Sequence, residues 1–224
     1  MTASVKSSQG SGSPRPGVDE AGSDRPRRRK PVQTRSRETV KRILDAAAGL
    51  IDEGGVDSVT TRVIADRAGI TAASLYRFFA DREQILDALV EHHLEQLTAH
   101  VAAVEADWAP TSVGEFVERE FASYAGYYRD HPNAARLWLD GRVSPTVRAE
   151  VLRYNRSTAE RLHGLAVTAG LAAPQGHLLV FVVAVELGDR VLELAFRERS
   201  DPDPDVIAHG RVALTAYLDA ALRQ

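Results

Sequence analysis

The stretch IADRAGITAASLYRFFADREQIL, residues 64–86, decides the fold of this chain of 224 residues. Its apolar side chains recur three or four residues apart, which is the period of an amphipathic helix. Gly69 interrupts this period, and a glycine can adopt the positive φ angle that a tight turn between helices requires. Small Ala65 lets the two helices approach closely. The stretch therefore predicts two short helices, over about 61–68 and 72–79.

Two helices joined in this way form a helix-turn-helix, whose second helix enters the major groove of DNA. Arg77 is the candidate base reader, because arginine is the commonest specific partner of guanine. Tyr76 and side chains near helix N-termini are candidates for phosphate, which the free N–H groups there also favour. An ordinary helical hairpin with solvated polar side chains is the alternative. The expected DNA contacts in this part of the chain are Thr61, Arg62, Thr71, Ala72, Ala73, Ser74, Tyr76, Arg77 and Arg82.

Read in full, residues 64–86 resemble the DNA-binding signature of the tetracycline-repressor (TetR) family of bacterial transcriptional regulators. The matching elements are Ile-Ala-x-x-Ala-Gly-Ile at 64–70, Leu-Tyr-x-x-Phe at 75–79 and the upstream ILDAA at 43–47, so the resemblance covers about residues 35–90. Two positions depart from the family's pattern. Arg82 stands where lysine is common, and Ala73 stands where glycine or proline is frequent. The resemblance implies a homodimeric repressor whose C-terminal half binds a small effector.

Helical periodicity continues along the rest of the chain, without a convincing alternating strand pattern. Asp81, Ser112 and Ser144 are placed as N-caps, because their side chains can accept the free N–H groups of a first turn. The chain is therefore expected to be all-α: an N-terminal three-helix helix-turn-helix domain followed by a helical bundle. About nine helices are expected, over 36–53, 61–68, 72–79, 82–107, 112–131, 132–140, 144–169, 174–199 and 204–223.

Composition divides the chain into three expected parts. Residues 1–30 are rich in Ser, Gly and Pro and have little apolar surface, so they are expected to form a disordered tail with a basic end. Residues 31–90 are expected to form the DNA-binding domain, whose last helix links it to the remainder. Residues 91–224 are expected to bind an effector and to dimerise.

Charge is unevenly distributed, although the net charge is only −3. Residues 24–42 carry nine cations and two anions, whereas residues 91–224 carry 13 cations and 19 anions. A cationic arm beside a helix-turn-helix can follow the phosphate backbone or enter a minor groove. A solvated tail without a DNA role is the alternative. The candidate contacts in this arm are Arg28, Arg29, Lys30 and Arg35.

Aromatic side chains cluster between residues 112 and 169, and bundle cores of this kind often hold small ligands. An apolar or aromatic effector is therefore expected, although each aromatic side chain also fits a plain core. Charged residues that interrupt the apolar helix after residue 178 could orient a ligand or pair across a dimer. The expected ligand contacts are Phe121, Tyr124, Tyr128, Trp138, Tyr154, Phe181 and Glu186.

The helix that contains LLVFVVAV, residues 178–185, is apolar on all sides and must be buried on several of them. With the last helix it could form a four-helix interface between two subunits, as the resemblance implies, or the core of a monomer. A two-fold dimer predicts a pseudo-palindromic operator. The expected interface residues are Leu178, Val182, Val185, Leu192, Leu214, Tyr217, Leu218 and Ala221.

Other classes of protein fit less well. The chain has no cysteine, which excludes disulfides and cysteine-ligated metals, and its histidines lack metal-site spacing. No metal, cofactor or catalysis is expected. No apolar run reaches the ~20 residues of a membrane span, so a cytoplasmic location without membrane contact is expected. A helical adaptor for proteins would not use polar residues on an open helix face. The sequence favours a ligand-responsive regulator that binds double-stranded DNA. The resemblance favours a repressor that a small effector releases, and activation is the alternative that the sequence leaves open.

Overall fold

The computed structural model describes residues 30–140, 144–197 and 201–223, and side chains within these ranges except those of 30–34 and 138–140. The described residues form nine α-helices and a short 3₁₀-helix, without a strand, which confirms the expected all-α class. The 3₁₀-helix η1 spans Val56–Ser58. The α-helices are α1 (Lys30–Gly54), α2 (Thr61–Arg67), α3 (Ala72–Leu75), α4 (Arg82–Glu105), α5 (Val113–Asp130), α6 (Pro132–Asp140), α7 (Pro145–Thr168), α8 (Leu178–Phe196) and α9 (Pro204–Ala221).

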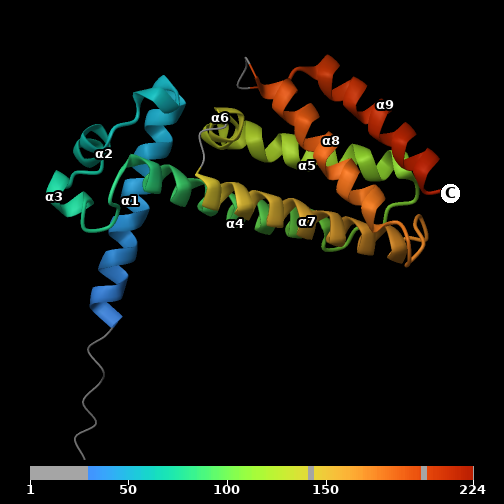
Figure 1. Ribbon diagram of the computed structural model, residues 1–224, viewed down its shortest axis with the longest axis horizontal. Helices are drawn as coiled ribbons and strands as arrows, with labels where there is room; N and C mark the ends of the chain where they lie inside the picture. The colour runs from blue at the N-terminus through green and yellow to red at the C-terminus, as the bar shows by residue number, and fades with distance from the viewer. Residues whose placement is uncertain (1–29, 141–143, 198–200, 224) are drawn as a thin grey trace, which may run out of the picture.

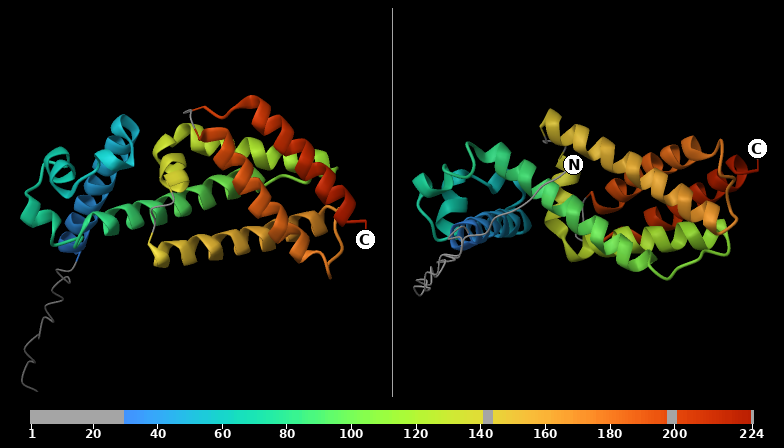
Figure 2. Two further views of the ribbon diagram at one scale, coloured as in Figure 1. Left: turned by 45° about the horizontal axis from the view of Figure 1, so that its top comes forward. Right: turned by 90° about the horizontal axis from the view of Figure 1, so that it is seen from below.

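The helices gather into a small head and a larger bundle (Figure 1). Helices α1, α2 and α3 form the head, and α4 runs from the head along the bundle of α5 to α9, as the two further views also show (Figure 2). Each part has its own hydrophobic core, and α4 belongs to both, with Leu94 in the head core and Leu97 in the bundle core. A rigid helix shared by two cores can transmit a displacement from one to the other.

Local signals in the sequence account for the geometry of the head. Gly69 has a φ angle of 65°, as the tight turn between α2 and α3 requires. The Thr71 side chain caps α3 by accepting the N–H of Ser74 at 3.1 Å. Asp81 caps α4 by accepting the N–H of Gln84 at 2.8 Å, and Gln84 accepts the N–H of the residue before Asp81 at 2.9 Å. The first of these bonds confirms the predicted N-cap at Asp81, and the two together resemble a capping box.

Three helix boundaries differ from the expected ones by four residues or more. Helix α1 begins at Lys30 and not near residue 36, since Pro31 fits the first turn of a helix without losing a hydrogen bond. Helix α3 ends at Leu75 and not at 79, because the chain then forms tighter turns with i to i+3 bonds. Helix α8 begins at Leu178 and not at 174, because Gly176, with a φ angle of 89°, breaks the helical path. The expected tail, apart from Lys30, lies outside the described residues.

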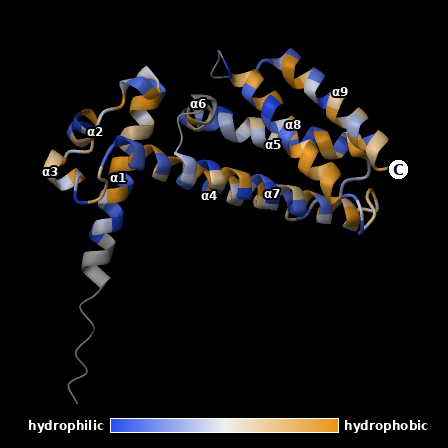
Figure 3. Cartoon of the chain, viewed as in Figure 1, coloured by the Kyte–Doolittle hydropathy of each residue, from blue (hydrophilic) through white to orange (hydrophobic). Residues whose placement is uncertain are grey.

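Helices α8 and α9 form the last layer of the bundle. The hydropathy colouring shows the N-terminal half of α8 as an almost continuous hydrophobic ribbon (Figure 3). The two helices approach closely where Gly210 faces Val191. A Cβ atom added to Gly210 would lie 2.3 Å from Cγ1 of Val191, far inside contact distance. No helix in the described part of the chain is long and apolar enough to cross a membrane.

We expect Gly210→Ala to lower the free energy of unfolding by about 1 kcal/mol. Overpacking against the stiff, β-branched Val191 costs about 1–3 kcal/mol, whereas exchanging a helical glycine for alanine returns up to about 1 kcal/mol. Urea unfolding measures the difference. Gly164→Ala in α7 is the matched control, because nothing lies within 4 Å of an added Cβ there, and it should stabilise the protein. Equal stabilisation by both substitutions would show that α8 and α9 do not approach closely.

Candidate functional site

Helix α3 lies at the outer end of the head (Figure 1). Most residues of the segment 71–77 are exposed there, several of them polar. Leu75 is fully buried and Phe79 nearly so, and they anchor the segment in the head core. Thr71 and Arg77 are exposed, and Ser74 is half-buried. Ala72 and Ala73 are also exposed and add no bulk to this face. The segment 71–77 therefore offers hydroxyl groups and one guanidinium on a rigidly held, sterically open surface.

The N-terminus of α2 lies beside this surface. The hydroxyl groups of Thr61 and Tyr76 are 3.1 Å apart and share a hydrogen bond, and the Tyr76 side chain remains 54% exposed. Arg62 next to Thr61 is exposed as well. The first N–H groups of a helix have no partner within the helix and favour an anion. The arrangement brings two hydroxyls, a cation and a helix N-terminus to one place, which suits a phosphate.

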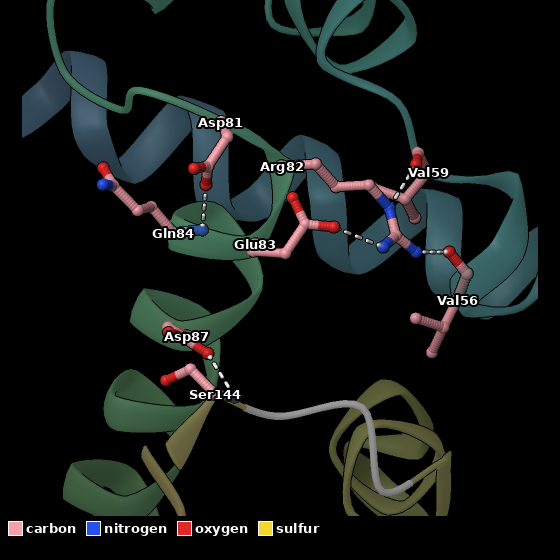
Figure 4. A network of polar contacts seen from close by, with 8 residues as sticks. All are labelled: Val56, Val59, Asp81, Arg82, Glu83, Gln84, Asp87 and Ser144. Atoms are coloured by element: carbon pink, nitrogen blue, oxygen red, sulfur yellow. Dashed lines mark hydrogen bonds and ion pairs between the residues drawn. The ribbon is translucent and has the colours of Figure 1, made fainter. Parts of the chain in front are cut away.

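The guanidinium of Arg82, an expected phosphate contact, has partners within the head. It donates from Nε to the carbonyl of Val59 and from Nη2 to the carbonyl of Val56, both at 2.7 Å (Figure 4). Its third nitrogen pairs with Glu83 at 3.4 Å. Only 22% of the side chain is exposed. Arg82 therefore ties the start of α4 to the chain between α1 and α2, and these partners favour a structural role over the expected phosphate contact.

The basic arm is only partly described. Arg28 and Arg29 lie outside the described residues, and Lys30 is the first residue of α1, without a described side chain. Arg35 and Arg37 are exposed on the part of α1 that extends away from the rest of the head (Figure 1). A continuous helix holds these cations at fixed spacing.

A cavity of about 80 Å³ lies in the bundle, between α5, α7, α8 and α9. On the same measure one water needs about 10–15 Å³, so the cavity has room for an organic group. Four expected ligand contacts line it: Phe121, Tyr124, Tyr154 and Phe181. Tyr128 and Glu186 do not line it, and the side chain of Trp138 is not described. Lining residues that the sequence analysis missed include Phe116, Glu120, Asn155, Thr158 and Asp189.

Part of the expected dimer face lies at the same cavity. Leu192, Leu214 and Leu218 are buried and line the cavity within their own chain, and half-buried Val185 lines it too. The other four expected interface residues, Leu178, Val182, Tyr217 and Ala221, are half-buried. The large apolar side chains that α8 and α9 leave exposed are instead Leu179, Val183, Leu187, Leu194 and Val212.

Two carboxyl groups stand among the apolar walls of the cavity. Burial raises the pKa of Glu120 to about 7, against a smaller opposing effect of Arg119. Burial also raises the pKa of Asp189 to about 7, although the hydrogen bond from Asn155 Nδ2, 2.7 Å long, favours its charged form. A desolvated carboxylate is costly unless a partner compensates it. The cavity therefore has an acidic side, and no cation of the described residues lines it.

A buried hydrogen-bond network connects the bundle to the end of α1. His93 of α4 contacts the hydroxyl of Tyr127 through Nδ1 at 2.9 Å and Oδ1 of Asn133 through Nε2 at 2.5 Å. Asn133 Nδ2 donates to Asp52 of α1 at 2.9 Å. Arg136 of α6 donates to the carbonyls of Ile51 and Asp52, both at 2.6 Å, at the helix end that favours a cation. We call these contacts of His93, Asn133 and Arg136 the α1–α6 network.

Burial keeps His93 neutral within this network. Because Asn133 Oδ1 is an acceptor, Nε2 of His93 carries the hydrogen. The Tyr127 hydroxyl, which lies 2.9 Å from Nδ1, also lies 3.1 Å from the His93 carbonyl and 3.3 Å from Oε1 of Gln96, two acceptors for its hydrogen. Burial lowers the pKa of His93 to about 4, with nearby His131 and His92 acting in the same direction. A second proton on the ring is therefore disfavoured by desolvation.

We expect His93 to make the protein less stable as the pH falls. The folded pKa is about 4 and the ordinary value 6.5, so the unfolded chain takes up this proton first. The resulting loss between pH 7 and pH 5 is about 2 kcal/mol. Glu120 and Asp189, with raised pKa values, act in the opposite sense, so the measurement is the difference in unfolding free energy between native protein and His93→Gln. A difference that does not change with pH would contradict the buried, neutral histidine.

Comparison with known proteins agrees with this architecture. The family described as "Bacterial regulatory proteins, tetR family" matches residues 43–89, and the "Tetracyclin repressor-like, C-terminal domain" matches residues 111–222. A TetR-family transcriptional regulator from Streptomyces coelicolor is 32% identical, with a TM-score of 0.59 over 82% of this chain and 99% of that chain.

Curated relatives match over shorter spans. The tetracycline repressor protein class A from transposon 1721 of Escherichia coli is 36% identical over 39% of this chain and 40% of its own length. The regulator BetI of Cronobacter sakazakii is 28% identical over 54% of this chain and 60% of its own length. The chain thus spans less than two thirds of these relatives. The two family matches cover both the head and the bundle, and the chain belongs to the tetR family of bacterial regulatory proteins.

Proposed function

We propose that the protein is a homodimeric, ligand-responsive transcriptional repressor, which leaves a palindromic operator when a small apolar or aromatic effector occupies the bundle cavity. The observation that carries this proposal is the open polar surface at 71–77, held on a capped and buried pair of helices. The division into a DNA-binding part at 31–90, an effector and dimer part at 91–224 and a basic tail at 1–30 belongs to the proposal. So do a cytoplasmic site of action and a role in binding without catalysis.

In this proposal the base-reading surface is Thr71 to Arg77, and Thr61, Arg62 and Tyr76 hold a phosphate. Arg77 is the cation best placed to read a base, since it is exposed at the end of α3. Arg82 is left out of the DNA contacts because carbonyl groups and Glu83 engage its guanidinium. Two subunits join through the exposed apolar side chains of α8 and α9, and their two heads read two half-sites.

Deleting residues 1–29 should reduce the salt dependence of operator binding. The deleted segment contains Arg25, Arg27, Arg28 and Arg29. Each phosphate that a cation neutralises adds about 0.9 to the slope of log affinity against log salt. Fluorescence anisotropy titrations between about 50 and 200 mM salt measure the slope for both proteins. An unchanged slope would show that the arm neutralises no phosphate.

Release would pass from the cavity to the head through α4 and the α1–α6 network. The network holds the end of α1 against α6, and α4 joins both cores. A ligand shifts the protein only if it binds the released state more tightly than the DNA-bound state. By linkage, DNA must then weaken ligand binding by the same factor.

A binding cycle tests this function. Compounds that raise the melting temperature are first found in a thermal-shift screen, and DNA affinity is then measured with and without each compound on a duplex selected from a random pool. Calorimetry of the same compound with and without DNA gives the other side of the cycle. We expect equal factors of about 5- to 150-fold on both sides. A compound that binds in the cavity yet leaves DNA affinity unchanged would contradict ligand-responsive release.

A further inference from the structure

The polar atoms that the cavity leaves unsatisfied are hydrogen-bond acceptors. Oε2 of Glu120 and Oδ1 of Asn155 are buried and have no hydrogen-bond partner within the described structure. Both residues line the cavity, Glu120 from α5 and Asn155 from α7. Asn155 is only 7% exposed. A buried acceptor without a donor is costly, and such a group in a native structure requires an explanation.

The orientation of the Asn155 amide follows from its neighbours. Its Nδ2 donates to Asp189 at 2.7 Å and to Glu186 at 3.2 Å, both carboxyl groups of α8. Exchanging the amide oxygen and nitrogen would set a carbonyl oxygen against these carboxyl oxygens. The unpaired atom of Asn155 is therefore its oxygen, which needs a donor from outside the protein.

The tyrosine and threonine hydroxyls at the cavity are hydrogen-bonded to one another, since Thr158 bonds to both Tyr124 and Tyr154. The hydroxyls of Tyr124 and Tyr154 are 3.5 Å apart, and Arg161 donates to the Tyr124 hydroxyl at 3.3 Å while pairing with Glu105. Among the described residues, no lysine, arginine or histidine lines the cavity. The remaining walls are aromatic and aliphatic. The cavity thus combines a large apolar surface with unpaired acceptors and a carboxyl group, and it lacks a cation.

We propose that the effector is a ring-containing apolar compound with an ammonium group, which Glu120 and Asn155 bind. This inference rests on the proposed function, because it names the ligand class of the same cavity. An ammonium group supplies up to three donors and the missing positive charge, and hydrogen bonds between charged groups are the strongest of their kind. The apolar ring packs against the aromatic walls. A carboxylate ligand would meet Glu120 and Asp189 with the wrong charge.

Binding of an ammonium group should also release protons. Burial holds the pKa of Glu120 near 7, so at pH 7 this carboxyl group is partly protonated before binding. The groups that face it are Arg119 of its own helix, Tyr124 and Tyr154, with Asp189 across the cavity. A bound cation favours the charged carboxylate and lowers its pKa. Proton release on binding therefore indicates a cationic ligand, because a purely apolar ligand would not cause it.

Three probes that share a phenethyl group test the proposal: phenethylamine, phenethyl alcohol and hydrocinnamate, which carry an ammonium, a hydroxyl and a carboxylate. Calorimetry with the full chain at pH 7, in two buffers of different ionisation enthalpy, gives affinity and proton release. We expect the amine to bind about tenfold or more tightly than the alcohol, with proton release, and the carboxylate to bind weakest. Equal or tighter binding of the alcohol or carboxylate, or no binding of any probe, would overturn the proposal.

Two variants test whether Glu120 causes the preference for the amine. Glu120→Gln should lose the preference for the amine over the alcohol. A melting temperature at pH 7 that is no lower than that of the native protein would show that this variant folds. Glu118→Gln on the same helix is the matched control, since Glu118 is 47% exposed, pairs with Arg211 and does not line the cavity. It should keep the preference. An unchanged preference in Glu120→Gln would overturn the proposal.

DNA binding is measured separately by anisotropy, so the two proposals can fail independently. Preference for the amine by a protein that binds no DNA would support the ligand class and contradict the proposed function. DNA binding without preference for the amine would overturn the ligand class alone.

Discussion

Replacing Arg77 with alanine is expected to weaken binding to a selected operator by about 100-fold, while the protein remains folded and dimeric. Arg77 is exposed beyond the end of α3, and no ion pair holds it within the described chain. One bidentate contact between arginine and guanine is worth about 1–3 kcal/mol, and a dimer makes it twice. Anisotropy titrations on the operator and on a scrambled duplex measure the loss. The loss should be larger on the operator.

Arg67→Ala is the matched control for this experiment. Arg67 lies in α2 of the same head, but its guanidinium pairs with Glu53 of α1 at 2.6 Å. The substitution removes the same charge without touching the surface at 71–77, so operator affinity should change little. If Arg77→Ala weakened binding to the operator and to the scrambled duplex equally, Arg77 would be a phosphate contact and not the base reader.

Arg82→Ala is expected to destabilise the head by about 3 kcal/mol. Its guanidinium donates to two backbone carbonyls at 2.7 Å, and hydrogen bonds of charged groups contribute about 1.5–3 kcal/mol each. Arg82→Lys should be nearly as harmful, because a single ammonium cannot reproduce the fork that spans both carbonyls. Amide hydrogen exchange of α2 and α3, in both variants and the native protein, measures the stability of the head separately from the bundle.

The lysine variant distinguishes this role from a contact with phosphate. A phosphate contact needs charge, which lysine keeps, so operator affinity and head stability would both survive Arg82→Lys. That result would return Arg82 to the DNA interface. If protection from exchange falls in both variants, Arg82 has a structural role in the head.

Much of the head could be predicted from the sequence because its signals are local. The turn at Gly69, the cap at Thr71 and the capping box at Asp81 each depend on residues a few positions apart. The partners of Arg82 could not be predicted, because they are not local. Its partners, the carbonyls of Val56 and Val59, lie 26 and 23 residues earlier in the chain and become neighbours only after folding.

The bundle could be predicted less well, because α8 is apolar around most of its circumference. Periodicity cannot then show which side faces the cavity and which faces a partner, so buried Leu192 and exposed Leu187 look alike in the sequence. The position of Glu120 could have been predicted from the sequence. It lies four residues after Phe116 and four before Tyr124, on the stripe that lines the cavity. A carboxylate on an apolar stripe indicates a polar group inside a core.

Selection of bound DNA from a random pool tests the central claim most directly, since it asks whether the head reads sequence and whether two heads read together. The account predicts enrichment of an inverted repeat whose half-sites are spaced for a two-fold dimer, and loss of that enrichment with Arg77→Ala. Recovery of no common sequence, or of the same sequences by the native protein and Arg77→Ala, would contradict it.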